Sequence, residues 1–124
     1  MNILVVEDDE SVAELLRRAL ELLGNHCYLA PDAQIADRIL HDTAVDAVTL
    51  DLGIPGRDGL EWLETMAVSR PRLAGRTLVI TGLAVSPDLA QRMARCGAGL
   101  LAKPFTLELL AEAVRAQLGW QRPN

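Results

Sequence analysis

Short apolar segments alternate along the chain with longer segments of helical spacing. The short segments are rich in Val, Ile and Leu and comprise residues 3–6, 27–30, 47–50, 77–80 and 100–102. Such nearly continuous apolarity over a short run is typical of strands that are buried on both faces, as in a parallel sheet. The pattern therefore predicts five buried parallel strands.

The segments between these strands carry the start and stop signals of helices. Residue types that favour N-caps stand at the predicted helix starts, namely Asp32, Asp58, Ser86 and Thr106. Pro87 follows at a first helical position, and Gly24 suits a left-handed C-cap. The first predicted helix has one apolar face, made of Val12, Leu15, Leu16, Ala19, Leu22 and Leu23. We therefore expect five helices.

Five strand–helix units in succession, without repeats or low-complexity linkers, predict helices on both faces of a parallel sheet. A chain of 124 residues that is 50% hydrophobic suits one domain with one sheet. We expect a doubly wound α/β domain over residues 1–119. Residues 120–124 are predicted to be a polar C-terminal tail or the start of a linker.

Composition excludes several classes of function. The chain has 12 basic and 17 acidic residues, and its longest basic run is the pair Arg17-Arg18, so we expect no direct nucleic-acid binding by this domain. No apolar run approaches the roughly 20 residues that cross a bilayer, and the N-terminus does not resemble a signal peptide. We therefore expect a cytoplasmic protein without membrane contact. Cys27 and Cys96 are too few for a disulfide framework or a metal cluster and are expected to be reduced and half-buried.

Polar residues directly follow four of the predicted strands: Glu7, Asp8, Asp51, Thr81 and Lys103. In a doubly wound sheet the carboxyl ends of the strands meet at the ligand site, so these side chains should converge. Several carboxylates at one edge repel one another and favour a hard divalent cation with oxygen ligands. Mg²⁺ fits this set best. His26 and His41 lie away from this edge, so zinc is not expected.

A carboxylate beside Mg²⁺, a hydroxyl and a lysine can accept a phosphoryl group. Asp51 would attack the phosphorus, Lys103 would pair with a phosphoryl oxygen, and Thr81 would donate a hydrogen bond to the transferred group. The backbone carbonyl of Gly53 is a candidate additional metal ligand. Gly82, which follows Thr81, is expected to keep the entrance uncrowded.

The ordered set of motifs resembles the receiver domain of a two-component response regulator, and the resemblance extends over the whole chain. The matching parts are Ile3-Leu4-Val5-Val6-Glu7-Asp8-Asp9, Asp51 with Pro55 and Gly59, Thr81-Gly82 and Lys103-Pro104-Phe105. The resemblance implies a flavodoxin-like fold with strand order 2-1-3-4-5 and a cis Lys103–Pro104 bond. It also implies particular roles: Asp51 as phosphoacceptor, Asp8 and Asp51 as direct Mg²⁺ ligands, Glu7 as a ligand through water, Thr81 as switch hydroxyl and Lys103 as pocket lysine.

Partners are also implied by the resemblance. The phosphoryl group would come from a sensor histidine kinase or a histidine phosphotransfer protein, and Ser11 and Glu14 lie near enough to the pocket to contact it. Phosphorylation would alter a surface around the fourth helix, the fifth strand and the fifth helix. The fifth helix carries a second apolar stripe, which could contact an output domain or a second copy of the chain: Leu109, Ala113 and Ala116. The domain would catalyse only its own phosphorylation and dephosphorylation, and so would not be an enzyme with a separate substrate.

Two positions depart from the family pattern. Leu100 stands three residues before Lys103, where receiver domains usually carry Tyr or Phe, so signalling by rotation of an aromatic ring is not expected. Around Ala98-Gly99 and at Ala113 the chain lacks the charged residues through which response regulators with a winged helix commonly dimerise. Dimerisation through a charged face is therefore not expected.

Two other functions remain open. A phosphorylation-independent interaction module would keep the fold without the switch, and Leu100 is the only residue that favours it. An aspartyl-phosphate phosphohydrolase would share the Asp, the hydroxyl, the lysine and Mg²⁺. That enzyme class needs a general acid two residues beyond its nucleophile, where this chain has Gly53.

Overall fold

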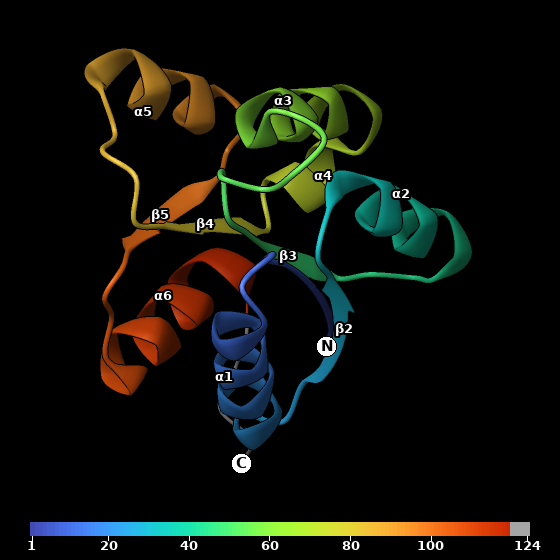
Figure 1. Ribbon diagram of the computed structural model, residues 1–124, viewed down its shortest axis with the longest axis vertical. Helices are drawn as coiled ribbons and strands as arrows, with labels where there is room; N and C mark the ends of the chain where they lie inside the picture. The colour runs from blue at the N-terminus through green and yellow to red at the C-terminus, as the bar shows by residue number, and fades with distance from the viewer. Residues whose placement is uncertain (120–124) are drawn as a thin grey trace.

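The computed structural model describes residues 1–119. Strands and helices alternate in the order β1 (Asn2–Val6), α1 (Glu10–Leu22), β2 (His26–Ala30), α2 (Ala33–Asp42), β3 (Ala47–Leu50), α3 (Gly59–Ser69), α4 (Pro71–Ala74), β4 (Thr77–Thr81), α5 (Pro87–Arg95), β5 (Gly99–Ala102) and α6 (Leu107–Leu118). Neighbouring strands are parallel, and their order across the sheet is β2-β1-β3-β4-β5 (Figure 1). The doubly wound fold and its strand order are confirmed. The predicted tail at 120–124 lies outside the described residues.

The sheet separates two hydrophobic clusters, because successive residues of a strand point to opposite faces. In β1, Ile3 and Val5 join the cluster that includes α1 and α6, whereas Leu4 and Val6 join the cluster that includes α2 and α3. Figure 1 shows α1 and α6 below the sheet and α2 to α5 above it. Burial on both faces explains why the strand segments are apolar at almost every position.

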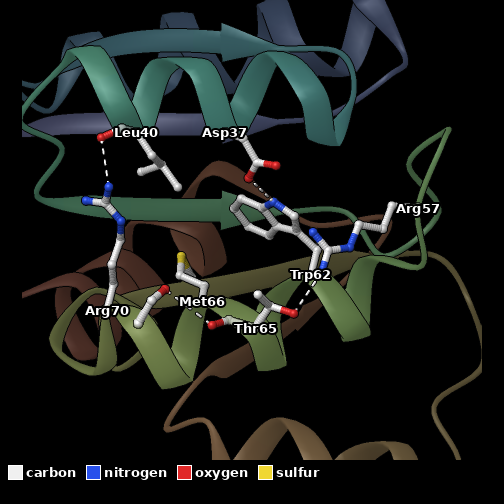
Figure 2. Close-up of a pocket in the computed structure, with 8 residues that line it drawn as sticks. Asp37, Leu40, Arg57, Trp62, Thr65, Met66 and Arg70 are labelled. Carbon is white, nitrogen blue, oxygen red and sulfur yellow. Dashed lines mark hydrogen bonds between the residues drawn. The ribbon is translucent and has the colours of Figure 1, made fainter.

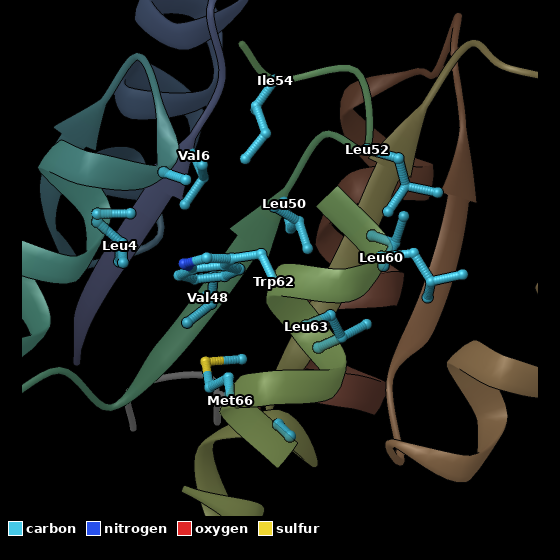
Figure 3. Packing of buried hydrophobic residues seen from close by; sticks show 14 of the residues in the cluster. Leu4, Val6, Val48, Leu50, Leu52, Ile54, Leu60, Trp62, Leu63 and Met66 are labelled. Carbon is cyan, nitrogen blue, oxygen red and sulfur yellow. The ribbon is translucent and has the colours of Figure 1, made fainter. Parts of the chain in front are cut away.

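Trp62 joins α3 to the sheet and to α2. Its ring is buried beside Val48 and Met66 (Figure 3). Its Nε1 donates a hydrogen bond of 2.8 Å to Oδ1 of Asp37 in α2 (Figure 2), so its polar atom is satisfied. Truncation of a buried Trp to Ala typically costs about 3–5 kcal/mol. This anchor positions α3 and with it the loop that follows Asp51.

The helix ends follow the local signals of the sequence. The first residues of α2, α3, α5 and α6 donate backbone hydrogen bonds to cap side chains, which confirms the predicted N-caps Asp32, Asp58, Ser86 and Thr106. Asp9 caps α1 in the same way, accepting from the amides of Ser11 and Val12. Pro87 begins α5 as predicted. Gly24 follows α1 with a φ of +91°, a conformation that favours glycine.

The predicted apolar face of α1 is partly wrong. Leu15 is 56% exposed and Leu22 is 81% exposed, whereas the buried residues of α1 are Ala13, Leu16, Ala19 and Leu20. Neighbouring residues of a helix differ by about 100° in direction, so one Leu of an adjacent pair can face the core while the other faces solvent. Packing against the sheet selects Leu16 and Leu20, and periodicity alone does not distinguish these alternatives.

A short helix, α4, adds to the five predicted helices. Arg70 ends α3, because the next residue, Pro71, has no backbone N–H to continue the α3 hydrogen bonds. Pro71 instead begins a new turn, since its fixed φ suits the first position of a helix. Five of the six helices in residues 1–119 correspond to the predicted ones, and α4 is an additional single turn.

The last helix packs one apolar stripe on the core and exposes two further leucines. Leu110, Val114 and Leu118 are buried in the cluster that α6 shares with α1, and Phe105 packs against the same cluster. Leu107, the first residue of α6, is exposed. Leu109, in the predicted second stripe, is also exposed, which leaves an apolar surface at the start of α6.

Neither cysteine forms a disulfide, as predicted, but both are buried in the core rather than half-buried. Burial raises the pKa of the Cys27 thiol to about 11. It therefore remains protonated near neutral pH and is a poor nucleophile.

Candidate functional site

Backbone hydrogen bonds between strand ends bring the predicted site residues to one edge of the sheet. The amide of Asp51 donates to the carbonyl of Val6 (2.9 Å), and the amide of Lys103 donates to the carbonyl of Thr81 (3.0 Å). Because β1 and β3 are neighbours, Glu7 leaves β1 beside Asp51. The carboxyl edge therefore holds, as predicted, Glu7, Asp8, Asp51, Thr81 and Lys103.

Lys103 connects two carboxylates that are far apart in the sequence. Its Nζ lies 3.0 Å from Oδ2 of Asp51 and 3.1 Å from Oε2 of Glu7. The side chains of Lys103, Asp51 and Glu7 are only 21%, 13% and 2% exposed, respectively. Charge-assisted hydrogen bonds in such partly desolvated surroundings are stronger than surface ion pairs. One ammonium group thus offsets part of the charge of the acidic pocket.

The Asp51 carboxylate is held by a second set of contacts on its other oxygen. Oδ1 accepts a hydrogen bond of 3.0 Å from the amide of Gly53 and a longer one of 3.4 Å from the Thr81 hydroxyl. The Thr81 hydroxyl in turn accepts from the amide of Leu83 (3.2 Å). Thr81 therefore links Asp51 to the loop between β4 and α5.

These contacts shift the pKa values of the Glu7 and Asp51 carboxyls in opposite directions. Burial, together with the neighbouring Asp51, raises the pKa of Glu7 to about 7. Burial alone would raise the pKa of Asp51 as well, but the hydrogen bonds from Gly53 and Lys103 outweigh it and lower that pKa. Asp51 is therefore ionised at neutral pH, as a nucleophilic carboxylate must be.

The same carboxylates form a candidate metal site. Glu7, Asp8 and Asp51 each offer an oxygen atom, and these atoms lie within 4.8 Å of one another, the only such group found in residues 1–119. Asp8 is exposed, which leaves room for water on the metal. Carboxylate oxygens with an open, hydrated side suit Mg²⁺. The fourth candidate ligand, the carbonyl of Gly53, stays a prediction.

Comparison with known proteins decides the family. The family model described as the response regulator receiver domain matches residues 3–115. The chain belongs to this family.

The receiver domain is 37% identical over 127 residues to the response regulator MprA of Mycolicibacterium vanbaalenii, a match that covers all of this chain and 53% of that protein. The chain thus spans about half the length of the curated relatives it matches. A CheY-like receiver structure from Methanospirillum hungatei is 24% identical, with a TM-score of 0.85, and covers 95% of this chain and 93% of that chain. This likeness confirms the flavodoxin-like fold.

A structure of a response regulator protein from Burkholderia pseudomallei is 28% identical, with a TM-score of 0.80, and covers 95% of this chain and 68% of that chain. That structure contains a phosphorylated aspartic acid, a calcium ion and citrate. No helix in residues 1–119 of the present receiver domain is both long enough and apolar enough to cross a membrane.

Leu100 of the receiver domain lies in the edge strand β5 and is 45% exposed. The only Tyr and the only Phe of the chain do not replace the usual ring at this position. Tyr28 lies in β2, at the opposite edge of the sheet, and Phe105 packs with α1 and α6. Among the described residues, therefore, no aromatic side chain stands beside Thr81 on this surface.

The expected steric role of Gly82 in the receiver domain is not supported. A Cβ atom at Gly82 would lie 3.7 Å from the Cβ of Lys103, an ordinary van der Waals contact. A small side chain would therefore fit at this point. The loop after Thr81 is exposed, and the effect of Gly82 on the entrance stays a prediction.

An apolar depression beside the pocket is missing from the sequence predictions. It measures about 360 Å³ and is lined by Val12, Leu15, Lys103, Pro104 and Phe105. The sequence pattern placed Leu15 in the core, although it is exposed here. A sequence signal could have revealed this surface: Val12 and Leu15 are three residues apart, which places their side chains next to each other on one side of α1.

Proposed function

We propose that this receiver domain is a phosphorylation-dependent switch of a two-component system that accepts a phosphoryl group on Asp51. The observation that carries the proposal is the arrangement around one ionised carboxylate: Lys103 lies on one oxygen, and Gly53 and Thr81 lie on the other. Such an arrangement holds the nucleophile in a fixed orientation before the donor arrives.

The chemistry follows from these contacts. An oxygen of Asp51 attacks the phosphorus, the bond between phosphorus and the donor's leaving group breaks, and the leaving group keeps the electron pair. The Lys103 ammonium, already 3.0 Å from Asp51, would pair with a phosphoryl oxygen. The Thr81 hydroxyl would exchange its long hydrogen bond to Asp51 for a stronger one to the charged phosphoryl group.

Mg²⁺, held by Glu7, Asp8 and Asp51 with the Gly53 carbonyl as a further ligand, would supply positive charge to the phosphoryl oxygens. The donor chemistry of the residues present fits this ion, since all the candidate ligands are oxygen atoms. The response regulator from Burkholderia pseudomallei supports the combination, because its structure contains a phosphorylated aspartic acid together with a divalent cation, calcium.

The competing phosphohydrolase function is not favoured by the geometry. At the position where that enzyme class needs a general acid, Gly53 has no side chain, and its amide donates to Asp51. The proposed domain therefore transfers the phosphoryl group to itself and releases it to water, without turning over a separate substrate.

The phosphodonor is proposed to be a sensor histidine kinase or a histidine phosphotransfer protein, in the cytoplasm. The depression between α1 and Phe105 is the proposed docking surface, because it combines apolar walls with direct access to Lys103. Glu14 forms ion pairs with Arg17 and Arg18 on α1, and its contact with the kinase stays a prediction.

The output surface is proposed to comprise α5, β5 and α6. Its exposed apolar residues include Leu100 and Leu109, and Leu83 is exposed on the adjoining loop before α5; these residues could contact an output domain or a second copy of the chain. The curated relatives are about twice as long as this chain, and the activity of their remaining half is not attributed to this domain. We also propose that residues 1–119 do not themselves bind nucleic acid.

The proposal is tested by incubating the chain with Mg²⁺ and acetyl phosphate and measuring its intact mass. We expect the mass of one phosphoryl group to be added to the wild type and to Asp42→Asn, an exposed control, but not to Asp51→Asn. If wild type gains no mass and also fails to bind beryllofluoride, the phosphorylation-independent module is favoured. Sustained turnover of phosphomonoesters would instead favour a hydrolase.

A further inference from the structure

Three arginines line a cavity at the amino edge of the sheet, the edge opposite to Asp51. The cavity measures about 380 Å³, and its lining comes from the turn before β3 and from the segment that contains α4: Val45, Asp46, Arg70, Pro71, Arg72, Leu73 and Arg76. Asp46 precedes β3, whereas Asp51 follows it, so this strand separates the cavity from the phosphoacceptor pocket.

The cavity carries an excess of positive charge. Three arginines and one aspartate line it, and the carboxylate of that aspartate, Asp46, already accepts a hydrogen bond of 2.7 Å from the amide of Asn2. The side chains of Arg72 and Arg76 make no ion pair or hydrogen bond with any residue in 1–119. The cavity is therefore locally basic, although the chain has a net charge of −5.

The arginines stand on a backbone that is held from several sides. The guanidinium of Arg70 donates to the carbonyl of Leu40 in α2 (3.1 Å), a contact that Figure 2 shows from the neighbouring pocket between α2 and α3. The Thr77 hydroxyl donates to the carbonyl of Leu73. Gln117 of α6 donates to the carbonyl of Gly75, between Arg72 and Arg76. A ligand would therefore meet a site whose main chain is already ordered, which reduces the entropy cost of binding.

We propose that this cavity binds a phosphomonoester dianion. Three arginines and one aspartate leave a charge of about +2, which a phosphomonoester near its dianionic state at neutral pH would neutralise. The planar guanidinium fork matches pairs of phosphate oxygens, whereas a single carboxylate would leave part of the charge unbalanced. The apolar walls, Val45, Pro71 and Leu73, would contact the organic part of the ester. The cavity volume lies within the range of small-molecule sites.

The first experiment follows amide shifts of the ¹⁵N-labelled chain without Mg²⁺, at constant ionic strength, as inorganic phosphate, AMP or adenosine is added. We expect saturable shifts at Asp46, Arg72, Gly75 and Arg76 with phosphate and with AMP, and none with adenosine. Tighter binding of AMP would show that the ester group uses the apolar walls. Equal affinity would show that the phosphate group alone is recognised. If none of these amides responds to either phosphate compound, the proposal is wrong.

Substitutions then test the arginines. Arg72→Gln and Arg76→Gln should each weaken phosphate binding about tenfold, the effect of losing a hydrogen bond to a charged group. Arg115→Gln removes the same charge from an exposed position on α6 and should leave the affinity unchanged. Preserved spectra elsewhere would show that the variants fold. Equal weakening by Arg115→Gln would reveal a nonspecific charge effect and overturn the proposal. So would a response to polyglutamate but not to phosphate, which would assign the cavity to an acidic polypeptide.

Discussion

The acidic pocket and the surface formed by α5 and β5 lie close together but are built differently. In the pocket, Lys103 and Asp51 make short polar contacts with side chains that are mostly shielded from water. On the neighbouring surface, Leu83 is 57% exposed and Leu100 is 45% exposed. A site that must position a reacting atom benefits from many fixed contacts, whereas a surface that must change needs few of them.

Thr81 belongs to both regions and therefore connects them. Its hydroxyl donates to Asp51 and accepts from the amide of Leu83. If the hydroxyl moves to a phosphoryl group, the Leu83 amide loses or changes its partner, and the loop before α5 can move without an aromatic ring at position 100. Under the proposed function, we expect this loop rather than Leu100 to carry the first part of the signal.

The largest expected effect tests the fixed contacts of the pocket. Lys103→Ala should slow phosphorylation by acetyl phosphate by roughly 10²–10³-fold, because it removes a preorganised positive group from the reaction site. The rate is measured by intact mass against time. Arg95→Ala, which removes a positive charge from the end of α5, serves as the control. An unchanged rate in Lys103→Ala would show that its contact with Asp51 has no part in the transfer.

The next effect concerns Mg²⁺. Three carboxylates near one lysine should make the folded state more stable when Mg²⁺ is present, by about 2.7 kcal/mol at a concentration one hundred times the dissociation constant. Asp8→Asn should reduce this gain, since Asp8 is a proposed direct ligand. Denaturant unfolding with and without Mg²⁺ measures the difference. If Asp8→Asn gains as much stability as wild type, Asp8 is not a ligand.

A smaller effect concerns pH in the absence of metal. Glu7 has a pKa of about 7 in the folded protein, against an ordinary value of 4.5, because of burial and of Asp51. The folded state thus keeps a proton that the unfolded chain releases, and the free energy of unfolding should fall by ~1–3 kcal/mol as the pH rises through this interval. Glu7→Gln should remove the slope, whereas the exposed control Glu112→Gln should keep it. Urea unfolding across the interval measures both.

The smallest expected effects compare two neighbouring leucines of β5. Leu101 packs against the cluster of α1 and α6, and Leu101→Ala should cost about 1–2 kcal/mol of stability. Leu100 is partly exposed, and Leu100→Ala should cost less than about 0.5 kcal/mol. Neither change should prevent phosphorylation. If Leu100→Ala abolishes the NMR response of α5 to beryllofluoride, then Leu100 carries the signal and the proposed route through Leu83 is wrong.

Much of the fold and the site could be predicted because the signals are local or ordered along the chain. The strands were recognisable from apolar runs. The starts of α3 and α6 were recognisable from Asp58 and Thr106, because Asp and Thr are preferred at N-caps. Glu7, Asp51 and Lys103 were recognisable because each follows a strand, and parallel strands end at the same edge. The errors, such as the exposure of Leu15 and Leu22, arose where periodicity leaves the direction of a helix face undetermined.

The sequence by itself determined the strands, the helix caps and the chemical types of the residues at the carboxyl edge, because these depend on near neighbours along the chain. Only the tertiary structure decided that Lys103 contacts Glu7 as well as Asp51, and that Arg70, Arg72 and Arg76 line one cavity. Such contacts depend on distances and directions between separate elements. Those are set by packing on both faces of the sheet, which no local pattern specifies.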